Sequence, residues 1–543
     1  MKLNPLIVSC SAMLQLLLVT AAVAQTAALP AGAPHLEKQG TATRLIVDGR
    51  PFLMIGGELM NSSSSSREHM QKLWPRLAAL PMNTVLTPLA WDMIEPVEGR
   101  YGFALVDGLL EDARKQHLHL VFLWLASWKN GMSSYPPLWV KKDFARFPRV
   151  PDREGNGREL LSTFGAASRD ADARAFAALM RHLREVDGKT HTVLMMQVEN
   201  EVGILNDSRD RSAAANQAYS GPVPAALMDY LQQHKETLIP EFRQIWAAAG
   251  GRTAGTWEQV FGAGPGTDEI FMAWNYARYV GHVAAAGKGE YAIPMYANCW
   301  LSQPYFLTPG TYPSGGPLAY LVDVWRAGAP AIDLLAPDLY GPNFIEWCEK
   351  YPRSGNPFFI PETESGPHGA WASFYAIGQH DAMGFSPFGI DLALDRGGPE
   401  LGRSYAVLQQ LAPVILEHQG LGHMTGFQLT KEHPAVTATL GGYELEISLD
   451  SIFGHSAEQG YGMIIATGPD EFVGAGTGFM VKFKPVTPGL PLAGFGGVVE
   501  GTYQDGKWVP GRHLNGDETD QGLHWRFNTF TVGIQHCTAY RHR

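Results

Sequence analysis

The sequence has little cysteine, few charges and no long apolar run beyond its first 25 residues. Only 17% of its 543 residues are charged, and its four cysteines include no C-x-x-C pair. If Cys10 is removed with an N-terminal segment, Cys299, Cys348 and Cys537 remain. This odd number fits neither a disulfide framework nor a zinc site; it is compatible with one bridge and requires none.

Several motifs of other enzyme classes are also missing. No H-E-x-x-H spacing occurs among the 18 histidines, no glycine-rich phosphate loop follows an apolar strand, and there is no G-x-S-x-G elbow. We therefore expect no metal, no cofactor and no serine-hydrolase chemistry. The net charge of −11 comes without a basic run, so we expect no nucleic-acid partner.

The N-terminus has the pattern of a secretory signal peptide. Lys2 precedes an apolar stretch from Leu6 to Val23 that ends in small residues before Gln25. We expect removal of residues 1–24, which carry one lysine and no acid, to give a periplasmic or secreted chain with a net charge of about −12. An uncleaved membrane anchor is the alternative, but the strongly apolar core is shorter than the roughly 20 residues of a helical span.

Apolar runs alternate with helical patterns from about residue 50 to residue 415. The eight predicted strands cover residues 52–57, 82–89, 118–125, 192–198, 292–299, 332–339, 357–361 and 383–390. Helical spacing of apolar residues fills the intervals, and the serine-rich stretch 62–66 is placed to cap the first helix. This rhythm predicts a (β/α)8 TIM barrel over residues 25–417, with a short strand segment at its N-terminal end.

The pattern changes after residue 418. Residues 443–449 alternate between apolar and polar side chains, and Asp505-Gly506 and Asn515-Gly516 are typical hairpin turns. We therefore predict a smaller antiparallel, β-sandwich-like domain over residues 418–543 that packs tightly on the barrel.

Carboxylates mark the ends of the fourth and seventh predicted strands. Glu201 ends the fourth, and Glu362 is the first polar residue after the seventh. Charge is costly inside a barrel, so these side chains belong at its carboxyl-terminal mouth, where they can serve the two-carboxyl chemistry of glycoside hydrolysis. Glu364 is the alternative nucleophile. Strand alternation turns Glu199 away from its neighbours and predicts a structural ion pair.

The motifs around these residues resemble glycoside hydrolase family 35, the β-galactosidases, within the clan of retaining (β/α)8 glycosidases. The matching stretches are residues 56–59, 82–85 with Trp91, 95–96, 98–103 and, above all, the Gln-Val-Glu-Asn-Glu run at 197–201. Asp92 and Ser127-Trp128 stand where many members have Asn and a Glu-Trp pair, so the resemblance is to a divergent bacterial branch.

The resemblance implies a role for each matching residue. It makes Glu201 the acid/base, Glu362 the nucleophile, and Asn200 the amide that binds the sugar 2-hydroxyl. Tyr340 stands where such enzymes place a tyrosine that hydrogen-bonds the nucleophile, a packed rim aromatic being its alternative. The implied activity is a retaining exo-β-galactosidase acting on galactosylated oligo- or polysaccharides, plant cell-wall polymers among them.

Further candidate sugar-binding residues lie at strand ends and in the loops that follow. They are Glu58, Asp92, Trp128, Asn130, Trp300 and Asp338. Aromatic rings after the third and fifth strands could stack on sugar faces, with core packing as the alternative for each: Trp128, Trp139, Trp300, Tyr305, Phe306 and Tyr312. The rival functions are another retaining glycosidase of the clan, such as a β-glucosidase or endo-glucanase, and a non-catalytic carbohydrate-binding protein.

Overall fold

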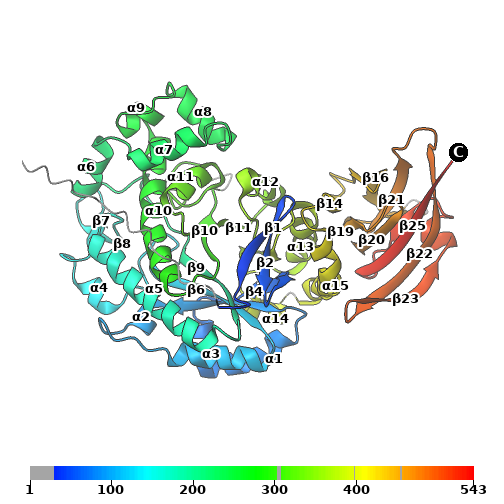
Figure 1. Cartoon of the computed structure of the whole chain (residues 1–543), viewed down its shortest axis with the longest axis horizontal. Helices are drawn as coiled ribbons and strands as arrows, with labels where there is room; N and C mark the ends of the chain where they lie inside the picture. The colour runs from blue at the N-terminus through cyan, green and yellow to red at the C-terminus, as the bar shows by residue number, and fades with distance from the viewer. Residues whose placement is uncertain (1–29, 303–306, 397, 453–454) are drawn as a thin grey trace, which may run out of the picture.

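The computed structural model describes residues 30–302, 307–396, 398–452 and 455–543. The predicted signal segment, Tyr305 and Phe306 lie outside the described residues. Figure 1 shows a helix-surrounded barrel followed by a sheet-rich domain that carries the C-terminus. Within the described ranges, no helix is both long and apolar enough to cross a membrane.

Eight parallel strands form the barrel, as predicted. Their order is β12-β11-β10-β9-β6-β5-β4-β13, and a parallel bridge between Ile360 and Phe385 links its two ends. The eighth strand, predicted at 383–390, is only two residues long, and the seventh, predicted at 357–361, is a two-residue strand at 362–363 preceded by the single bridge at Ile360. The strands are β4 (Met54–Glu58), β5 (Thr84–Ala90), β6 (His119–Lys129), β9 (Val193–Asn200), β10 (Met295–Trp300), β11 (Leu334–Leu339), β12 (Glu362–Thr363) and β13 (Gly384–Phe385).

Helices follow each barrel strand. Ser66 caps the first of them by accepting a 3.3 Å hydrogen bond from the backbone nitrogen of His69, as the serine-rich stretch predicted. The connection after β9 is the longest and contains five helices, α6 to α10. The helices are α1 (Arg67–Ala78), α2 (Trp91–Ile94), α3 (Ala104–Lys115), α4 (Leu138–Lys142), α5 (Ala166–Asp187), α6 (Ala213–Ser220), α7 (Ala225–Gln233), α8 (Pro240–Ala248), α9 (Trp257–Phe261), α10 (Pro265–Glu290), α11 (Val322–Gly328), α12 (Phe344–Lys350), α13 (Gly366–His380), α14 (Ile390–Arg396) and α15 (Gly398–His418).

A small N-terminal sheet closes one end of the barrel. It consists of β1 (His35–Gln39), β2 (Ala42–Val47) and β3 (Arg50–Phe52). Leu45 and Val47 share an apolar cluster with residues from the beginnings of barrel strands, such as Met54 and Leu334. This end is therefore filled with apolar side chains, and the polar groups of the strands collect at the opposite, carboxyl-terminal end.

Two antiparallel sheets with a common apolar core make up the C-terminal region. The six-stranded sheet contains β14 (Met424–Thr430), β19 (Gln459–Ala466), β20 (Glu471–Thr477), β25 (Gly533–His542), β22 (Leu492–Gln504) and β23 (Lys507–Leu514). The four-stranded sheet contains β15 (Ala435–Leu440), β16 (Tyr443–Leu449), β21 (Phe479–Pro485) and β24 (Trp525–Phe527).

The six-stranded sheet packs directly on the barrel helices, mainly α13. Met463 and Ile465 of β19 belong to the same apolar cluster as the barrel core. The contact is close because glycines face each other across it: a Cβ on Gly378 would lie 3.0 Å from the Cα of Gly426, and one on Gly426 would lie 2.5 Å from the carbonyl oxygen of Phe374. The three described cysteines are buried free thiols.

Candidate active site

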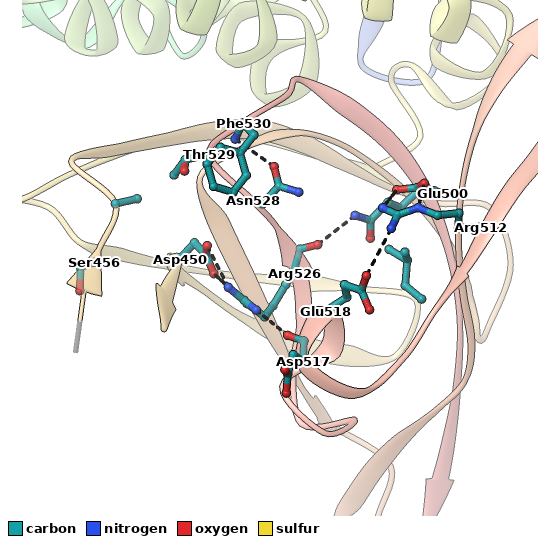
Figure 2. A pocket seen from close by; sticks show the side chains of 13 residues that line it. Asp450, Ser456, Glu500, Arg512, Asp517, Glu518, Arg526, Asn528, Thr529 and Phe530 are labelled. Carbon is teal, nitrogen blue, oxygen red and sulfur yellow. Dashed lines mark hydrogen bonds and ion pairs between the residues drawn. The ribbon is translucent and has the colours of Figure 1, made fainter. Parts of the chain in front are cut away.

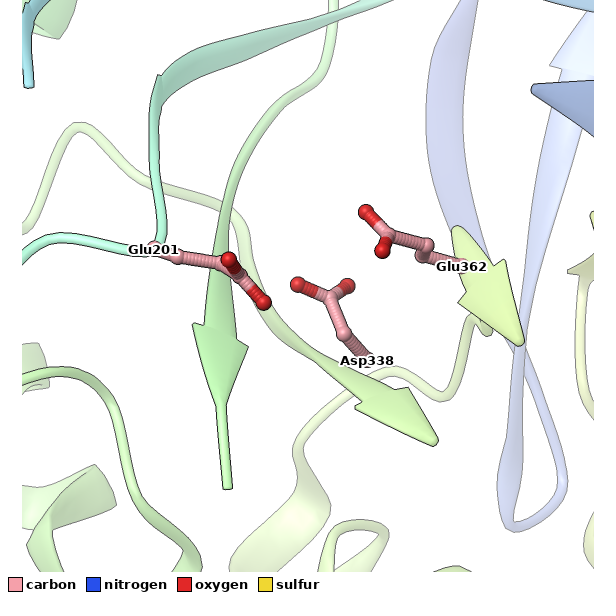
Figure 3. Close-up of side chains that lie close together, drawn as sticks. All are labelled: Glu201, Asp338 and Glu362. Carbon is pink, nitrogen blue, oxygen red and sulfur yellow. The ribbon is translucent and has the colours of Figure 1, made fainter. Parts of the chain in front are cut away.

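Four buried carboxyl side chains meet at the carboxyl ends of the barrel strands. Glu58 ends β4, Glu201 directly follows β9, Asp338 lies in β11 and Glu362 begins β12, and each is at most 7% exposed. One carboxylate oxygen each of Glu201, Asp338 and Glu362 lies within 4.8 Å of the others. Figure 3 shows these three carboxyls pointing toward one another, with Asp338 between the predicted catalytic pair.

A bulge in β6 brings a lysine into this group of acids. The strand extends past its predicted end at residue 125, and its register against β9 jumps between Trp124 and Lys129, which pairs with Asn200. The Lys129 Nζ donates a 2.5 Å hydrogen bond to Asn200 Oδ1. This fixes the amide, whose Nδ2 is buried with no partner among the described residues and is free to donate to a ligand hydroxyl.

Asn298 of β10 connects Glu201 to Asp338. Its Oδ1 accepts a 2.9 Å hydrogen bond from the backbone nitrogen of Glu201, and its Nδ2 donates to Asp338 Oδ2 at 2.7 Å. The side chain of Asn130 also hydrogen-bonds the Glu201 carboxyl. Glu201 and Asn130 both have positive φ angles, 45° and 52°, a strained backbone conformation that is common at functional sites.

The surroundings of the four carboxyls give them different pKa values. Burial, followed by the charge of Glu362, raises the pKa of Glu201 to about 7. Burial also raises the pKa of Glu362, but the Lys129 ammonium and the Tyr340 hydroxyl oppose this rise. Asp338 and Glu58 have pKa values raised well above their usual range, first by burial and then by the charge of Glu362. Glu362 is therefore placed to ionise first, while Glu201 keeps its proton to near neutral pH.

Tyr340 contacts the predicted nucleophile, as expected. Its hydroxyl donates a 2.6 Å hydrogen bond to Glu362 Oε1, and Glu362 Oε2 is buried without a partner among the described residues. Glu364, the alternative nucleophile, lies beyond the end of β12, is exposed and accepts a 3.1 Å hydrogen bond from the Gly341 backbone nitrogen. Glu362 is thus the member of this segment that faces the other carboxyls.

The ion pair predicted for Glu199 is wrong. This residue does turn away from Glu201, but its partner is another acid, Asp172 of α5, and its Oε2 accepts a 2.7 Å hydrogen bond from the backbone nitrogen of Trp128. Burial, followed by the charge of Asp172, raises the pKa of Glu199 well above its usual range, and burial also raises the pKa of Asp172, which favours a proton on this pair of carboxyls. The pair ties α5 to the bulge that carries Lys129.

Trp128 is not available to a sugar, contrary to its predicted role. It is fully buried, its ring lies edge-on against Tyr276 and Tyr279, and its Nε1 donates a 3.1 Å hydrogen bond to the carbonyl oxygen of Leu161. Residues 127 and 128 belong to the bulge, which turns this ring toward α10 instead of the mouth.

Two more of the predicted stacking aromatics are structural. Trp139 packs edge-on against Trp91, and Tyr312 is buried with its hydroxyl bonded to Glu269. Trp300 is half-buried at the end of β10, in register with Asp338, and remains at the rim. Asp92 is half-buried on α2, and burial raises the pKa of its carboxyl while Lys141 opposes the rise. It is not part of the catalytic group.

The three close acids have the oxygen donors that a divalent cation prefers. The Lys129 ammonium lies beside them, however, and lowers the pKa values of Glu201 and Glu362. A fixed positive charge in this position opposes a bound cation, so the site is better suited to a neutral substrate with a proton-transfer mechanism.

Lys129 and Asn298 are the site residues that the sequence analysis missed. Each had a usable signal, since Lys129 is the first charge after the apolar run from residue 120 and Asn298 is the only amide in the fifth strand. Polar groups at the end of an otherwise apolar barrel strand point to the mouth for the same reason as the carboxylates do.

Comparison with known proteins gives matches to two family models. Residues 61–270 match Glyco_hydro_42, described as β-galactosidase, and residues 401–526 match a domain of unknown function, DUF5597. A curated β-galactosidase from Xanthomonas manihotis is 27% identical over 206 residues, which are 36% of this chain and 32% of that protein. The chain thus aligns with about a third of the length of that relative.

The solved structures that match the chain share little sequence with it. A β-galactosidase from Rahnella sp. R3 is 16% identical, with 68% of this chain and 57% of that chain covered and a TM-score of 0.45. The catalytic domain of a β-amylase from Paenibacillus polymyxa is 12% identical, with coverages of 65% and 96% and a TM-score of 0.45.

The Glyco_hydro_42 match can be compared with the resemblance to family 35 found in the sequence. It covers β5, β6 and β9, including Glu201, and it is to a β-galactosidase family other than family 35. Over residues 61–270, therefore, the chain matches the Glyco_hydro_42 family of β-galactosidases.

Proposed function

We propose that the protein is a retaining exo-β-galactosidase that removes terminal galactose from oligo- or polysaccharides. The observation that carries the proposal is the pair of buried carboxyls of Glu201 and Glu362, with oxygens within 4.8 Å of each other. Retaining glycosidases hold their carboxyls about 5–5.5 Å apart, against about 6.5–9.5 Å in inverting enzymes, where a water must fit between them. The β-galactosidase family match supports the choice of sugar.

The site's own residues account for both steps of this reaction. In the first, Glu362 attacks the anomeric carbon while Glu201 gives its proton to the leaving oxygen, so the glycosidic bond breaks and a glycosyl ester forms. In the second, Glu201 takes a proton from water, the water oxygen attacks the anomeric carbon, and Glu362 leaves as a carboxylate. The free Nδ2 of Asn200 is oriented by Lys129 to donate to the 2-hydroxyl.

Three finer points belong to the same proposal. The motif resemblance places the chain near family 35, and it points to galactosylated plant cell-wall polymers as substrates. The N-terminal pattern favours export to the periplasm or medium after removal of residues 1–24. Glu58 at the end of β4 and Trp300 at the end of β10 lie on opposite sides of the mouth, and we expect both to contact the substrate.

A panel of aryl glycosides tests the sugar specificity. We expect release of the aryl group from the β-galactoside with retention of configuration at the anomeric carbon. Release from the β-glucoside alone would instead identify a β-glucosidase or endo-glucanase of the same clan, and no turnover of any member would identify a binding protein. Nuclear magnetic resonance of the first-formed sugar anomer distinguishes retention from inversion.

Variants of the two carboxyls test their separate roles. With Glu201→Ala and a substrate with a good leaving group, the glycosyl ester should accumulate, and azide should restore turnover with a β-glycosyl azide as product. Glu362→Ala should form no ester and give an α-azide or nothing. A 2-fluoro-galactoside should label Glu362; a label on Glu364 would contradict the assignment.

A further inference from the structure

The C-terminal domain contains a cavity of about 610 Å³ that the proposed catalytic reaction does not use. Figure 2 shows the side chains that line it. They come from β22, β23 and β25 of the six-stranded sheet, from β24 of the other sheet, and from residues 450, 456–457, 517–518 and 528–530. The volume lies within the roughly 300–1,000 Å³ typical of small-ligand sites.

Phe530 stands at this cavity with its ring in solvent. It is 88% exposed, the highest value among the large apolar side chains of the described residues. Its backbone nitrogen donates a 2.9 Å hydrogen bond to Asn528 Oδ1, and the Asn528 carbonyl oxygen accepts a 2.8 Å hydrogen bond from the Thr477 hydroxyl. A single exposed aromatic is ordinary, but this ring projects from a loop whose backbone is anchored beside a polar cavity, an arrangement that suits stacking on a sugar face.

The charges of the cavity exclude an anionic ligand. Arg526 makes a nearly buried two-point pair with Asp450 at 2.8 and 3.1 Å, and Arg512 makes an exposed two-point pair with Glu500 at 2.5 and 3.0 Å. Both guanidinium groups are therefore already neutralised. Because four acidic and two basic side chains line the cavity, its net charge is negative and it would repel phosphate, sulfate or uronic acid groups.

We propose that this cavity is a second carbohydrate-binding site, separate from the barrel mouth, that takes a segment of a neutral polysaccharide. Phe530 stacks on one sugar ring, and the paired carboxylates of Asp450 and Glu500 accept hydrogen bonds from sugar hydroxyls. Arg526 holds the nearly buried Asp450 carboxylate in a fixed orientation, which lowers the entropy lost on binding.

The site's function rests on the proposed β-galactosidase activity. Because the six-stranded sheet is packed on α13, a polymer bound in this cavity stays near the barrel and its effective concentration at the catalytic carboxyls rises. The benefit applies to a polymer long enough to engage both sites. A small aryl galactoside gains nothing from it.

Direct binding tests the proposal independently of catalysis. The full chain with Glu362→Gln, which leaves the polymer intact, is run through gels containing galactosylated xyloglucan, a neutral polymer, or polygalacturonate, an anionic one. Adding Phe530→Ala should weaken retardation by the neutral polymer, with a rise of about 3- to 10-fold in the dissociation constant. Retardation should persist with Phe530→Trp. Leu523→Ala, which is 65% exposed in the same domain but outside the cavity, is the matched control.

Kinetics on the otherwise unmodified enzyme give the second measurement. Phe530→Ala should raise KM for the polymer and leave kcat and KM for the aryl galactoside unchanged. Equal retardation of Phe530→Ala and its parent by xyloglucan would overturn the proposal, as would retardation by polygalacturonate alone. A change only in oligomeric state, measured by sedimentation, would overturn it in favour of an interface between copies. If no galactoside is hydrolysed while Phe530-dependent retardation persists, the catalytic proposal fails and this one stands.

Discussion

The hydrogen bond from Tyr340 to Glu362 should control the acid side of the pH profile. The bond is 2.6 Å long, and it lowers the pKa of a carboxyl that is only 7% exposed. A hydrogen bond to a charged group contributes roughly 1.5–3 kcal/mol, and one pKa unit corresponds to about 1.4 kcal/mol. Removing the hydroxyl in Tyr340→Phe should therefore raise the pKa of Glu362 by about 1–2 units.

The expected consequence is a narrower bell-shaped profile of kcat/KM. Glu362 must be ionised to attack, so its limb moves to higher pH, whereas the limb set by the proton of Glu201, with a pKa of about 7, moves much less. The maximum value of kcat/KM falls because the two limbs approach each other.

The assay is kcat/KM for an aryl β-galactoside between about pH 4 and pH 9, a range that spans the ordinary and the raised carboxyl pKa values. Tyr405→Phe is the control, since it also removes a buried hydroxyl, one that donates at 2.8 Å to the Gly56 carbonyl oxygen and whose pKa is raised by burial alone. An acid limb that stays in place or moves to lower pH in Tyr340→Phe would refute the reasoning. So would an equal shift in Tyr405→Phe.

Three further variants test other parts of the structure. Lys129→Met should move both limbs of the same profile to higher pH, because the ammonium lowers the pKa values of both catalytic carboxyls; a downward shift of either limb would contradict this. In the folded protein the pKa of Glu199 is raised above its ordinary 4.5. The free energy of unfolding of the wild type should therefore fall as the pH rises from about 4.5 through the folded pKa. Chemical denaturation of Glu199→Gln should show a smaller fall over the same pH window. Gly426→Ala should lower the free energy of unfolding by about 1–3 kcal/mol through overpacking, whereas Gly402→Ala, with no atom within 4 Å of the new Cβ, should not destabilise the protein.

The barrel and its catalytic pair could be predicted because both depend on the cost of burying charge. Eight apolar runs alternating with helical patterns leave few architectures other than a barrel, and the structure has all eight strands. A carboxylate directly after such a run must lie at the strand's end, so Glu201 and Glu362 could be placed at the mouth without coordinates.

Side-chain directions near the mouth could not be predicted in the same way. Strand alternation turned Glu199 away from Glu201 as expected, but it could reveal neither Asp172 as its partner nor the φ of 62° at this position. The bulge in β6 then sends Trp128 into the core and Lys129 to Asn200, although their neighbours in sequence suggested otherwise. Bulges and positive φ angles in non-glycine residues carry no reliable sequence signal, because tertiary contacts impose them.

The sequence by itself determined the barrel, the β domain after it and the two strand-end carboxylates, since periodicity and the cost of buried charge act locally along the chain. Only the tertiary structure decided how those carboxyls differ in acidity. The pKa of each depends on its burial and on groups distant in sequence, such as Lys129 beside Glu362 and Asp172 beside Glu199. Electrostatic interactions act through space, and folding alone brings these residues together.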